Sequence, residues 1–210
     1  MKLYDWLIAP NPRRVRMFLA EKGIEVEMEQ AAGPRDMDLA TWFLELDPRR
    51  RVPLLVLDDG THVGEAMAIC RYFDAQQPEP NLFGREPLAV ALIEMWERES
   101  EINCLQAGGE HVRNSHPAFK DRALPGYSEP TPQIAQLAER GKMRYYEFLS
   151  RAEAQLERHA YLAGEQFSAA DITAFCAVDF WQKFKLPLGE EHTRLKAWHE
   201  RIGQRPSATA

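Results

Sequence analysis

Strand-like segments occur only in the first third of this sequence, and that uneven distribution most constrains how the chain can fold. Short strand-like and helical segments alternate there, at residues 2–6 (strand), 13–22 (helix), 25–29 (strand), 39–46 (helix), 54–57 and 61–63 (strands) and 65–76 (helix). The last two strands flank Asp58-Asp59-Gly60, a sequence typical of a hairpin turn. The order βαβ-α-ββα therefore predicts an α+β unit over residues 1–77.

The rest of the chain lacks strand signals. Residues 78–87 hold three prolines and a glycine, which indicates a linker. Beyond it, residues 88–210 show long helical periodicities. With 210 residues, the chain is long enough for two small domains that share an interface. We therefore predict an α+β domain at 1–77, a linker at 78–87 and an all-α domain at 88–210.

Helical periodicity in the second part is strongest over residues 88–106 and 133–159, which are separated by a loop rich in proline and glycine. Ser168, three residues before Asp171, resembles a capping box that begins another helix. The remainder, as far as Ile202, is predicted to be helical as well.

The net charge of -6 argues against a nucleic acid as the main partner, because phosphate binding needs a concentrated basic surface. The sequence has no run of about 18 apolar residues, so no membrane span is predicted. Charged residues close to Met1 interrupt any apolar signal-peptide region. These features predict a cytoplasmic protein that binds neither nucleic acid nor membrane.

The three cysteines, Cys70, Cys104 and Cys176, are far apart and form no CxxC pair. An odd number of dispersed cysteines fits a reducing compartment and argues against a disulfide framework or a zinc ribbon. His111 and His116 have no third ligand at a useful spacing, so no metal site is predicted.

One candidate binding segment is Val52-Pro53, directly before the apolar strand at 54–57. A cis peptide bond here would leave the Val52 N–H and C=O free to pair with an extended, peptide-like ligand. The alternative is a plain proline at the start of a strand, since only about 5% of X–Pro bonds are cis.

A second candidate is Glu65-Ala66, which opens the helix predicted at 65–76. Backbone N–H groups at a helix start attract a carboxylate, and a glutamate beside them can hold an ammonium group. The alternative is an ordinary helix start, at which Glu65 is favourable against the helix dipole.

The third candidate is Asn11, between the first strand and the first helix. The start of a helix favours a thiolate, and the Asn11 side-chain amide can donate a hydrogen bond to one. The alternative is that Asn11 only caps the helix, with Pro12 at the first helical position.

Together these features resemble the cytosolic glutathione transferase family over nearly the whole chain. The matching segments, in the order and at the spacing of the family, are residues 13–24 (first helix), 47–55 (around the cis-proline), 65–69 (the Glu-Ser-x-Ala-Ile motif), 167–172 (the helical-domain capping motif) and 205–207 (the C-terminal end). Asn11 is similar to the asparagine of a bacterial subgroup that resembles disulfide-bond reductases.

The resemblance implies a thioredoxin-like N-terminal domain with a mixed four-stranded sheet and an all-α helical-bundle C-terminal domain, usually in a homodimer. It implies glutathione as cosubstrate, no permanently bound cofactor, and a role in detoxification. The expected reaction is attack of the glutathione thiolate on a small hydrophobic electrophile. Two alternatives stay open: a glutathione-dependent disulfide-bond reductase or peroxidase, and a non-catalytic glutathione-transferase-like binding protein.

The resemblance also implies how glutathione lies. The Val52 backbone, beside Pro53, pairs with the cysteinyl part, Arg51 lies near the glycyl carboxylate, and Glu65 with Ala66 holds the γ-glutamyl end. Ala66 replaces the serine of the family and removes a hydroxyl donor to the γ-glutamyl carboxylate. A hydrogen bond to a charged group contributes about 1.5–3 kcal/mol, so this loss weakens binding roughly tenfold or more.

A second departure concerns the group that activates the thiol. The first loop has no serine or cysteine, Tyr4 lies inside the first strand, and Ala9, in the glutathione site, stands where several classes have serine. We therefore expect Asn11 to donate to the thiolate, with a backbone donor as the open alternative. A free thiol has a pKa near about 8.5, so little of it is ionised at neutral pH. An amide donor with the helix dipole contributes on the order of 2 kcal/mol toward its ionisation.

The electrophile is expected between the two domains. Its expected walls come from the first loop and from the helical domain, namely Trp6, Leu7, Ile8 and residues 103–115 with His111. Glu97 and Glu101 are expected on an exposed helix face, turned to solvent or to a partner subunit.

Overall fold

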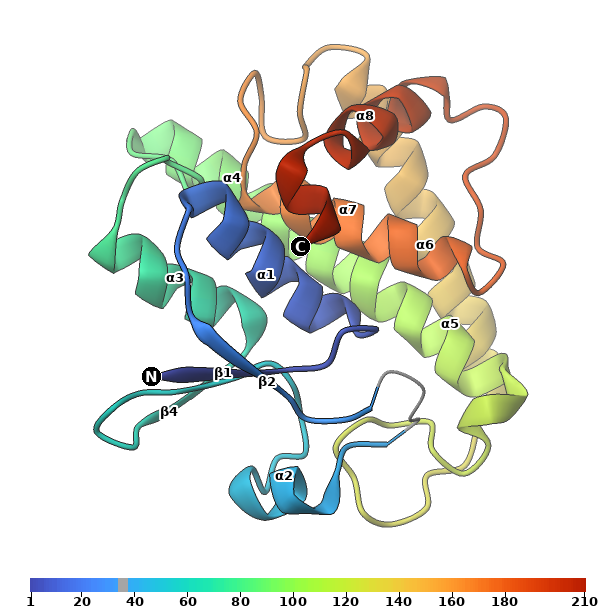
Figure 1. Cartoon of the computed structure of the whole chain (residues 1–210). Coiled ribbons are helices and arrows are strands. Elements are labelled where there is room, and N and C mark those ends of the chain that lie inside the picture. The colour runs from blue at the N-terminus through green and yellow to red at the C-terminus, as the bar shows by residue number, and fades with distance from the viewer. Residues whose placement is uncertain (34–37) are drawn as a thin grey trace.

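The computed structural model describes residues 1–33 and 38–210, and its first part is the predicted α+β unit (Figure 1). Its elements, in chain order, are β1 (Lys2–Asp5), α1 (Pro10–Lys22), β2 (Glu27–Gln30), α2 (Thr41–Leu46), β3 (Leu54–Val56), β4 (His62–Gly64) and α3 (Ala66–Gln76). The four strands of the described residues form one sheet in the order β2-β1-β3-β4. β1 is parallel to β2 and antiparallel to β3, and β3 is antiparallel to β4. The mixed four-stranded sheet is therefore confirmed.

Helix α1 begins earlier than predicted, at Pro10 instead of residue 13. Proline suits the first turn of a helix, because the N–H groups there have no intrahelical partner in any case. Ala9 is the N-cap residue, so the interpretation of Asn11 as the cap with Pro12 at the first helical position is wrong. The helix ends as predicted at Gly23, whose φ of 64° is a left-handed conformation that glycine adopts readily.

From Pro87 onward all helices and turns of the described chain confirm the all-α prediction. They are α4 (Pro87–Glu99), a π-helix (Ser100–Gln106), α5 (Ala107–Ser115), a 3-10 turn (Pro117–Phe119), α6 (Ala135–Leu156), α7 (Ala169–Gln182), α8 (Thr193–Gly203) and a final 3-10 turn (Pro206–Thr209). No helix among the described residues is both long and apolar enough to cross a membrane. The division into domains at 1–77 and 88–210 stays a prediction.

Local details differ from the sequence prediction at two places. The helix predicted at 88–106 widens into a π-helix at Ser100, whose hydroxyl donates to the Trp96 carbonyl over 2.6 Å and competes with the regular backbone bonds. The prediction of continuous helix to Ile202 is wrong, because residues 183–192 are not helical. Pro187, which lacks an N–H, lies within this break. The capping box of Ser168 and Asp171 at the start of α7 is confirmed.

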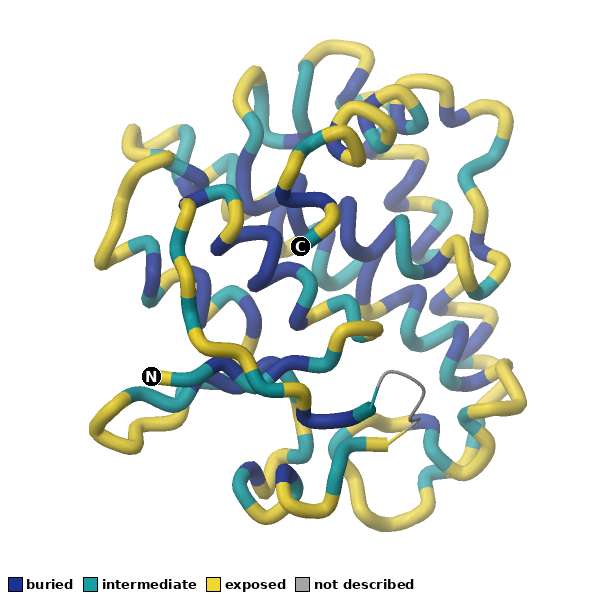
Figure 2. Tube along the Cα trace, viewed as in Figure 1, coloured by how far each residue is buried: buried dark blue, intermediate teal, exposed yellow. Residues whose placement is uncertain are grey.

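Helix α1 packs against α3 and against α7, so both parts of the chain share one core (Figure 1). A single cluster of buried side chains includes Leu3 and Phe18 from the first part and Phe175 and Trp198 from the helical part. Figure 2 shows α1 and α7 largely as buried segments at the middle of the molecule. Groups at the start of α1 therefore lie where the two parts meet.

The half-buried carboxylate of Glu21 ties residues 205–207 to α1. Arg205 donates from Nε and Nη2 to the two oxygens of Glu21, each over 2.7 Å, and the Ser207 hydroxyl bonds the same carboxylate. Burial alone raises the pKa of Glu21, but the hydrogen bonds from Arg205 and Ser207 outweigh it and hold that pKa below its ordinary value.

Glu21→Gln is expected to lower the free energy of unfolding at neutral pH by about 1.5–3 kcal/mol, the usual contribution of charge-assisted hydrogen bonds. Because the pKa of Glu21 is depressed in the folded state, this stabilisation is present above the ordinary carboxyl pKa and is lost as the pH falls through the folded value. Urea unfolding of both proteins at neutral pH and at about pH 3 measures the difference, which should shrink in acid. A difference of equal size at both pH values contradicts the prediction.

Candidate functional site

The register of the sheet brings the predicted binding segments to one end of it. Leu54 lies opposite Tyr4 on β1 and opposite Gly64 on β4. The segment before β3, the loop after β1 and the start of α3 therefore leave the sheet at the same end. These are the three segments in which the sequence places the glutathione-binding and catalytic groups.

The segment before β3 leaves a stretch of backbone unpaired. The Val52–Pro53 peptide bond is cis, as the family resemblance implies. Val52 is half-buried and Pro53 is buried. No described residue hydrogen-bonds to the Val52 N–H or C=O, so both groups are available to an extended ligand.

The start of α3 supplies a second set of free backbone donors. Glu65, with φ 64°, is the N-cap residue, and the first helical bond runs from the Ile69 N–H to its carbonyl. The intervening N–H groups, beginning with that of Ala66, have no partner among the described residues, and no acidic side chain lies in this first turn. An anion is therefore favoured at Ala66.

Two charged side chains stand beside these donors. The Arg51 guanidinium lies 4.0 Å from the Glu65 carboxylate, and both side chains are exposed. An exposed pair at this distance is weak, so each charge can turn to a ligand instead. One cation and one anion at this end of the sheet complement a ligand that carries carboxylates and an ammonium group.

Asn11 lies at the second position of α1 with its side chain exposed. Arg14 Nη1 donates to its Oδ1 over 2.7 Å. A guanidinium has only donors, so the oxygen must face Arg14 and the NH₂ group must face away from it. The Asn11 amide therefore presents its two N–H donors outward at the helix start.

The helix start offers few competing backbone donors. Pro10 and Pro12 have no N–H, and the Arg13 N–H bonds the Ala9 carbonyl over 3.4 Å. The Ala9 N–H is also occupied, since it donates to the Trp6 carbonyl over 2.9 Å. The Asn11 N–H has no described partner, so both the backbone and the side-chain donors at this helix end belong to Asn11.

Sequence reasoning missed the buried ion pair that lies behind Asn11. Arg14, 1% exposed, donates from Nη2 to Glu97 over 2.7 Å and from Nε to the Thr173 hydroxyl over 3.0 Å. Thr173 in turn donates to Glu97 over 3.2 Å. Burial raises the pKa of Glu97, and the adjacent Arg14 charge opposes that increase.

The expectation that Glu97 faces solvent or a partner subunit is therefore wrong, because its carboxylate is needed inside the chain to balance Arg14. Glu101 does lie nearer the surface, bonded to Arg98 over 2.6 Å. A signal was present in the sequence, since Arg14 lies four residues before the core residue Phe18, on the same helix face. A buried arginine needs a carboxylate partner.

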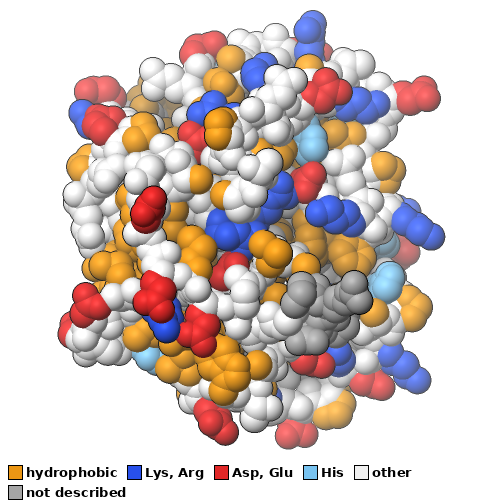
Figure 3. Space-filling model, in the orientation of Figure 1, with side chains coloured by type: hydrophobic (Ala, Val, Ile, Leu, Met, Phe, Trp, Pro, Cys, Tyr) orange, Lys and Arg blue, Asp and Glu red, His pale blue; other side chains and the backbone are white. Residues whose placement is uncertain are grey.

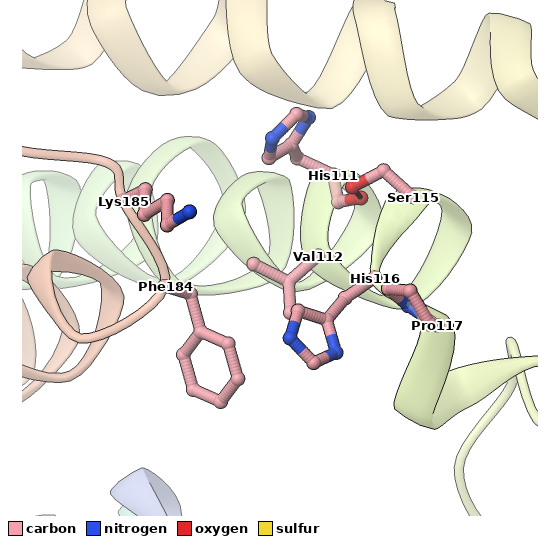
Figure 4. Close-up of a pocket in the computed structure, with 7 residues that line it drawn as sticks. All are labelled: His111, Val112, Ser115, His116, Pro117, Phe184 and Lys185. Carbon is pink, nitrogen blue, oxygen red and sulfur yellow. Dashed lines mark hydrogen bonds between the residues drawn. The ribbon is translucent and has the colours of Figure 1, made fainter.

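His111 lies in a pocket of about 220 Å³ in the helical part (Figure 4). The pocket is lined by His111, Val112, Ser115, His116, Pro117, Phe184 and Lys185. In Figure 4 the rings of Phe184 and His116 lie side by side, in an edge contact of 5.7 Å between their centroids. The described chain brings no three His, Cys, Asp or Glu side chains together as metal ligands.

The three residues of the first loop are not among those that line this pocket. Leu7 and Ile8 are 57% and 44% exposed, so both are available to an apolar ligand at the start of α1. Trp6 is half-buried, and its indole N–H has no hydrogen-bond partner among the described residues. The structure thus places Trp6, Leu7 and Ile8 beside Asn11, and His111 in a separate hollow of the helical part.

A second feature missed from the sequence is the loop between α5 and α6, which lies beside the segment before β3 (Figure 1). At Gly126 a Cβ would come within 2.8 Å of the Arg49 carbonyl oxygen and 3.0 Å of Arg51 Nε, so only glycine fits this approach. Arg122 of the same loop forms an ion pair with Asp38. The helical part therefore borders the site next to Arg51.

The protein's own thiols are not accessible to this site. Cys70, Cys104 and Cys176 are all buried, and burial raises the pKa of each thiol, that of Cys176 to about 11. Thiol chemistry here must therefore use a sulfur that the ligand supplies. Figure 3 shows Lys and Arg side chains over α1 at the centre of one face, next to hydrophobic ones, which suits an anionic thiol ligand with an apolar reaction partner.

Comparison with known sequences agrees with this arrangement. The family models for the glutathione S-transferase N-terminal domain and C-terminal domain match residues 8–76 and 116–206. Glutathione S-transferase 2 of Saccharomyces cerevisiae is 33% identical over 99% of this chain and 87% of its own length. The disulfide-bond oxidoreductase YfcG of Escherichia coli is 24% identical over 94% of this chain and 88% of its own length.

Comparison with solved structures gives the same result for the whole fold. The crystal structure of Gtt2 from Saccharomyces cerevisiae matches with a TM-score of 0.85 at 31% identity, covering 99% of this chain and 98% of that one. Similarity of sequence and of fold extends over both the α+β and the helical part. The chain belongs to the glutathione S-transferase family.

Proposed function

We propose that this protein binds glutathione at the end of its sheet and conjugates it, through its sulfur, to a small hydrophobic electrophile. The observation that carries the proposal is the Asn11 amide, held with its N–H donors outward at the start of α1. It stands where the unpaired Val52 backbone and the free N–H groups of α3 also converge.

In this proposal the tripeptide lies along the sheet end as an added strand. The Val52 N–H and C=O, beside Pro53, pair with the cysteinyl residue. Arg51 binds the glycyl carboxylate, and Glu65 binds the γ-glutamyl ammonium group. The Ala66 N–H binds the γ-glutamyl carboxylate, and Ala9 borders the sulfur without offering a donor.

The reaction proceeds in two steps. The thiol first loses its proton to water, and the Asn11 amide stabilises the resulting thiolate. The thiolate then attacks an electrophilic carbon, so that a C–S bond forms and the leaving group departs with its electron pair. Leu7 and Ile8, with Trp6, contact the apolar part of the electrophile, whereas His111, which lines a separate pocket, takes no part in the proposed step.

A second function, glutathione-dependent disulfide reduction, is favoured by the asparagine at position 11 and by the similarity to YfcG. Because no described cysteine is accessible, the exchange would use two glutathione molecules. The first thiolate attacks the disulfide and forms a mixed disulfide. The second thiolate then attacks this mixed disulfide and releases oxidised glutathione and the remaining thiol. In each step the leaving thiolate takes a proton from solvent.

Three measurements separate the functions. Calorimetry with glutathione tests binding, chlorodinitrobenzene conjugation tests attack of the thiolate on carbon, and hydroxyethyl disulfide reduction tests thiol–disulfide exchange. We expect heat of binding and faster conjugation than reduction. Faster reduction would favour the second function, and the absence of both activities would favour a non-catalytic binding protein. No heat at millimolar glutathione would overturn both glutathione-dependent functions.

Ala66→Ser is expected to tighten glutathione binding about tenfold, because the new hydroxyl can donate to the γ-glutamyl carboxylate. Ala66 is at the first position of α3, where the family has serine. Ala68→Ser is the matched control, since Ala68 is an exposed residue of the same helix turn. Calorimetry measures both variants, and an unchanged or weaker affinity for Ala66→Ser contradicts the proposed position of the γ-glutamyl end.

We also propose that the protein is a cytoplasmic homodimer, with domains 1–77 and 88–210, that serves detoxification. Dimerisation is what the family resemblance implies. Light scattering after size-exclusion chromatography tests it: a mass of one chain contradicts the dimer, and twice 24.1 kDa supports it.

A further inference from the structure

We propose that Arg14 is a positioning residue, which fixes the Asn11 side chain with its amide N–H donors turned toward the thiol of bound glutathione. The inference rests on the role proposed above for Asn11. Arg14 itself does not touch the sulfur in this proposal, because its guanidinium is turned into the core.

The need for such a residue follows from the exposure of Asn11. An exposed asparagine rotates broadly about its last torsion, so its amide oxygen and nitrogen exchange places at little energetic cost. The bond from Arg14 Nη1 to Asn11 Oδ1, at 2.7 Å, removes this freedom. A flipped amide would place two groups of N–H donors against each other, so only one orientation satisfies Arg14.

Arg14 can hold Asn11 because its own guanidinium is fixed on three sides. Nη2 donates to Glu97 of α4, Nε donates to Thr173 of α7, and Nη1 is shared between Asn11 and the Glu101 carboxylate 3.8 Å away. Glu97 and Thr173 also bond each other. Two helices of the helical part, α4 and α7, thus fix the direction in which the Asn11 amide on α1 points.

The competing explanation is that Arg14 only ties α1 to the helical part. Arg13 supplies the matched comparison, because it is the neighbouring residue and makes the same kind of link. It donates to Asp179 of α7 over 2.5 Å and to the Ala208 carbonyl over 3.0 Å. No bond joins Arg13 to the Asn11 side chain among the described residues.

A double-mutant cycle distinguishes positioning from a purely structural role. The proteins are wild type, Asn11→Ala, Arg14→Met and the double variant, each saturated with glutathione, and the measurement is ultraviolet titration of the bound thiolate. We expect either single change to lower the thiolate fraction at neutral pH about tenfold, and the double variant to match the single ones. Arg13→Met should lower thermal stability and leave the titration unchanged.

The outcomes separate this inference from the proposed function. If Asn11→Ala raises the thiol pKa and Arg14→Met does not, positioning is overturned and the role of Asn11 stands. Additive effects of the two changes also overturn positioning, since Arg14 would then act on the sulfur by itself. If Asn11→Ala leaves the titration unchanged, the role of Asn11 fails, and the inference falls with it.

Removing Arg14 alone leaves the buried Glu97 carboxylate unpaired, which can prevent folding. Two further variants test the proposal without leaving the Glu97 charge unpaired. Arg14→Met with Glu97→Gln removes both charges, and it should show the same loss of thiolate as Arg14→Met. Thr173→Val keeps the ion pair but leaves Arg14 Nε without its acceptor. It should raise the pKa of the bound thiol by a smaller amount than Arg14→Met does. An unchanged titration in both variants overturns the proposal.

Discussion

Asn11→Ala is expected to lower kcat/KM for chlorodinitrobenzene conjugation at neutral pH by roughly 10- to 100-fold. The estimate is the loss of one hydrogen bond to a charged group, about 1.5–3 kcal/mol, expressed as a rate at 1.4 kcal/mol for each factor of ten. The variant keeps the backbone N–H at position 11, so it removes only the side-chain donor. Asn11 is exposed, and the substitution should leave thermal stability and glutathione affinity close to wild type.

The loss of kcat/KM in Asn11→Ala should depend on pH. The side-chain donor favours the thiolate over the thiol, so its loss raises the pKa of the bound thiol. The deficit in kcat/KM should therefore be largest in mildly acidic solution and should shrink as the pH rises and the thiol ionises without help. A rate equal to wild type at neutral pH, in a protein that still binds glutathione, shows that another donor activates the thiol.

Asp171→Ala is expected to destabilise the fold by about 3–5 kcal/mol. The Asp171 carboxylate is fully buried and accepts four hydrogen bonds. They come from the Ser168 N–H and hydroxyl, the Leu162 N–H and the Trp198 indole, at 2.9–3.1 Å. Alanine leaves these donors buried without an acceptor and removes the Asp171 half of the capping box of α7.

For a chain of this size the loss corresponds to a fall in Tm of roughly 6–20 °C. Circular dichroism melting and urea unfolding measure it. Asp59→Ala is a suitable control, because Asp59 also accepts a backbone bond, from the Thr61 N–H over 2.9 Å, but is exposed. The control should lose far less stability, because its carboxylate is solvated in the folded protein. A similarly small loss for Asp171→Ala would show that the capping box is not a main support of the helical part.

The sequence predicts most of the fold because the relevant signals are local. The Asp58-Asp59-Gly60 turn, the stop at Gly23 and the box of Ser168 with Asp171 each act within four residues, and each is found in the structure. The end of helical structure after α7 was missed, because an isolated Pro187 competes with strong helical periodicity on both sides. The start of α1 was missed because two prolines stand where the helix begins.

Much less of the site could be predicted, since its parts depend on contacts between distant residues. Arg14 and Glu97 are 83 positions apart, and neither sequence neighbourhood indicates the other. Glu97 lies on a helix with many charged residues, so an exposed face was the natural expectation. The approach of Gly126 to Arg51 likewise depends on how a long loop crosses the sheet end. Asn11 could be selected from the sequence, but the direction of its amide could not.

A crystal structure of the protein with glutathione is the most direct test of the proposed site. We expect the sulfur within hydrogen-bond distance of Asn11 Nδ2, with the Asn11 oxygen still bonded to Arg14. We also expect the cysteinyl backbone paired with Val52 and the γ-glutamyl carboxylate at the Ala66 N–H. A glutathione molecule whose sulfur points away from Asn11, toward Ala9 or into solvent, would contradict the proposal.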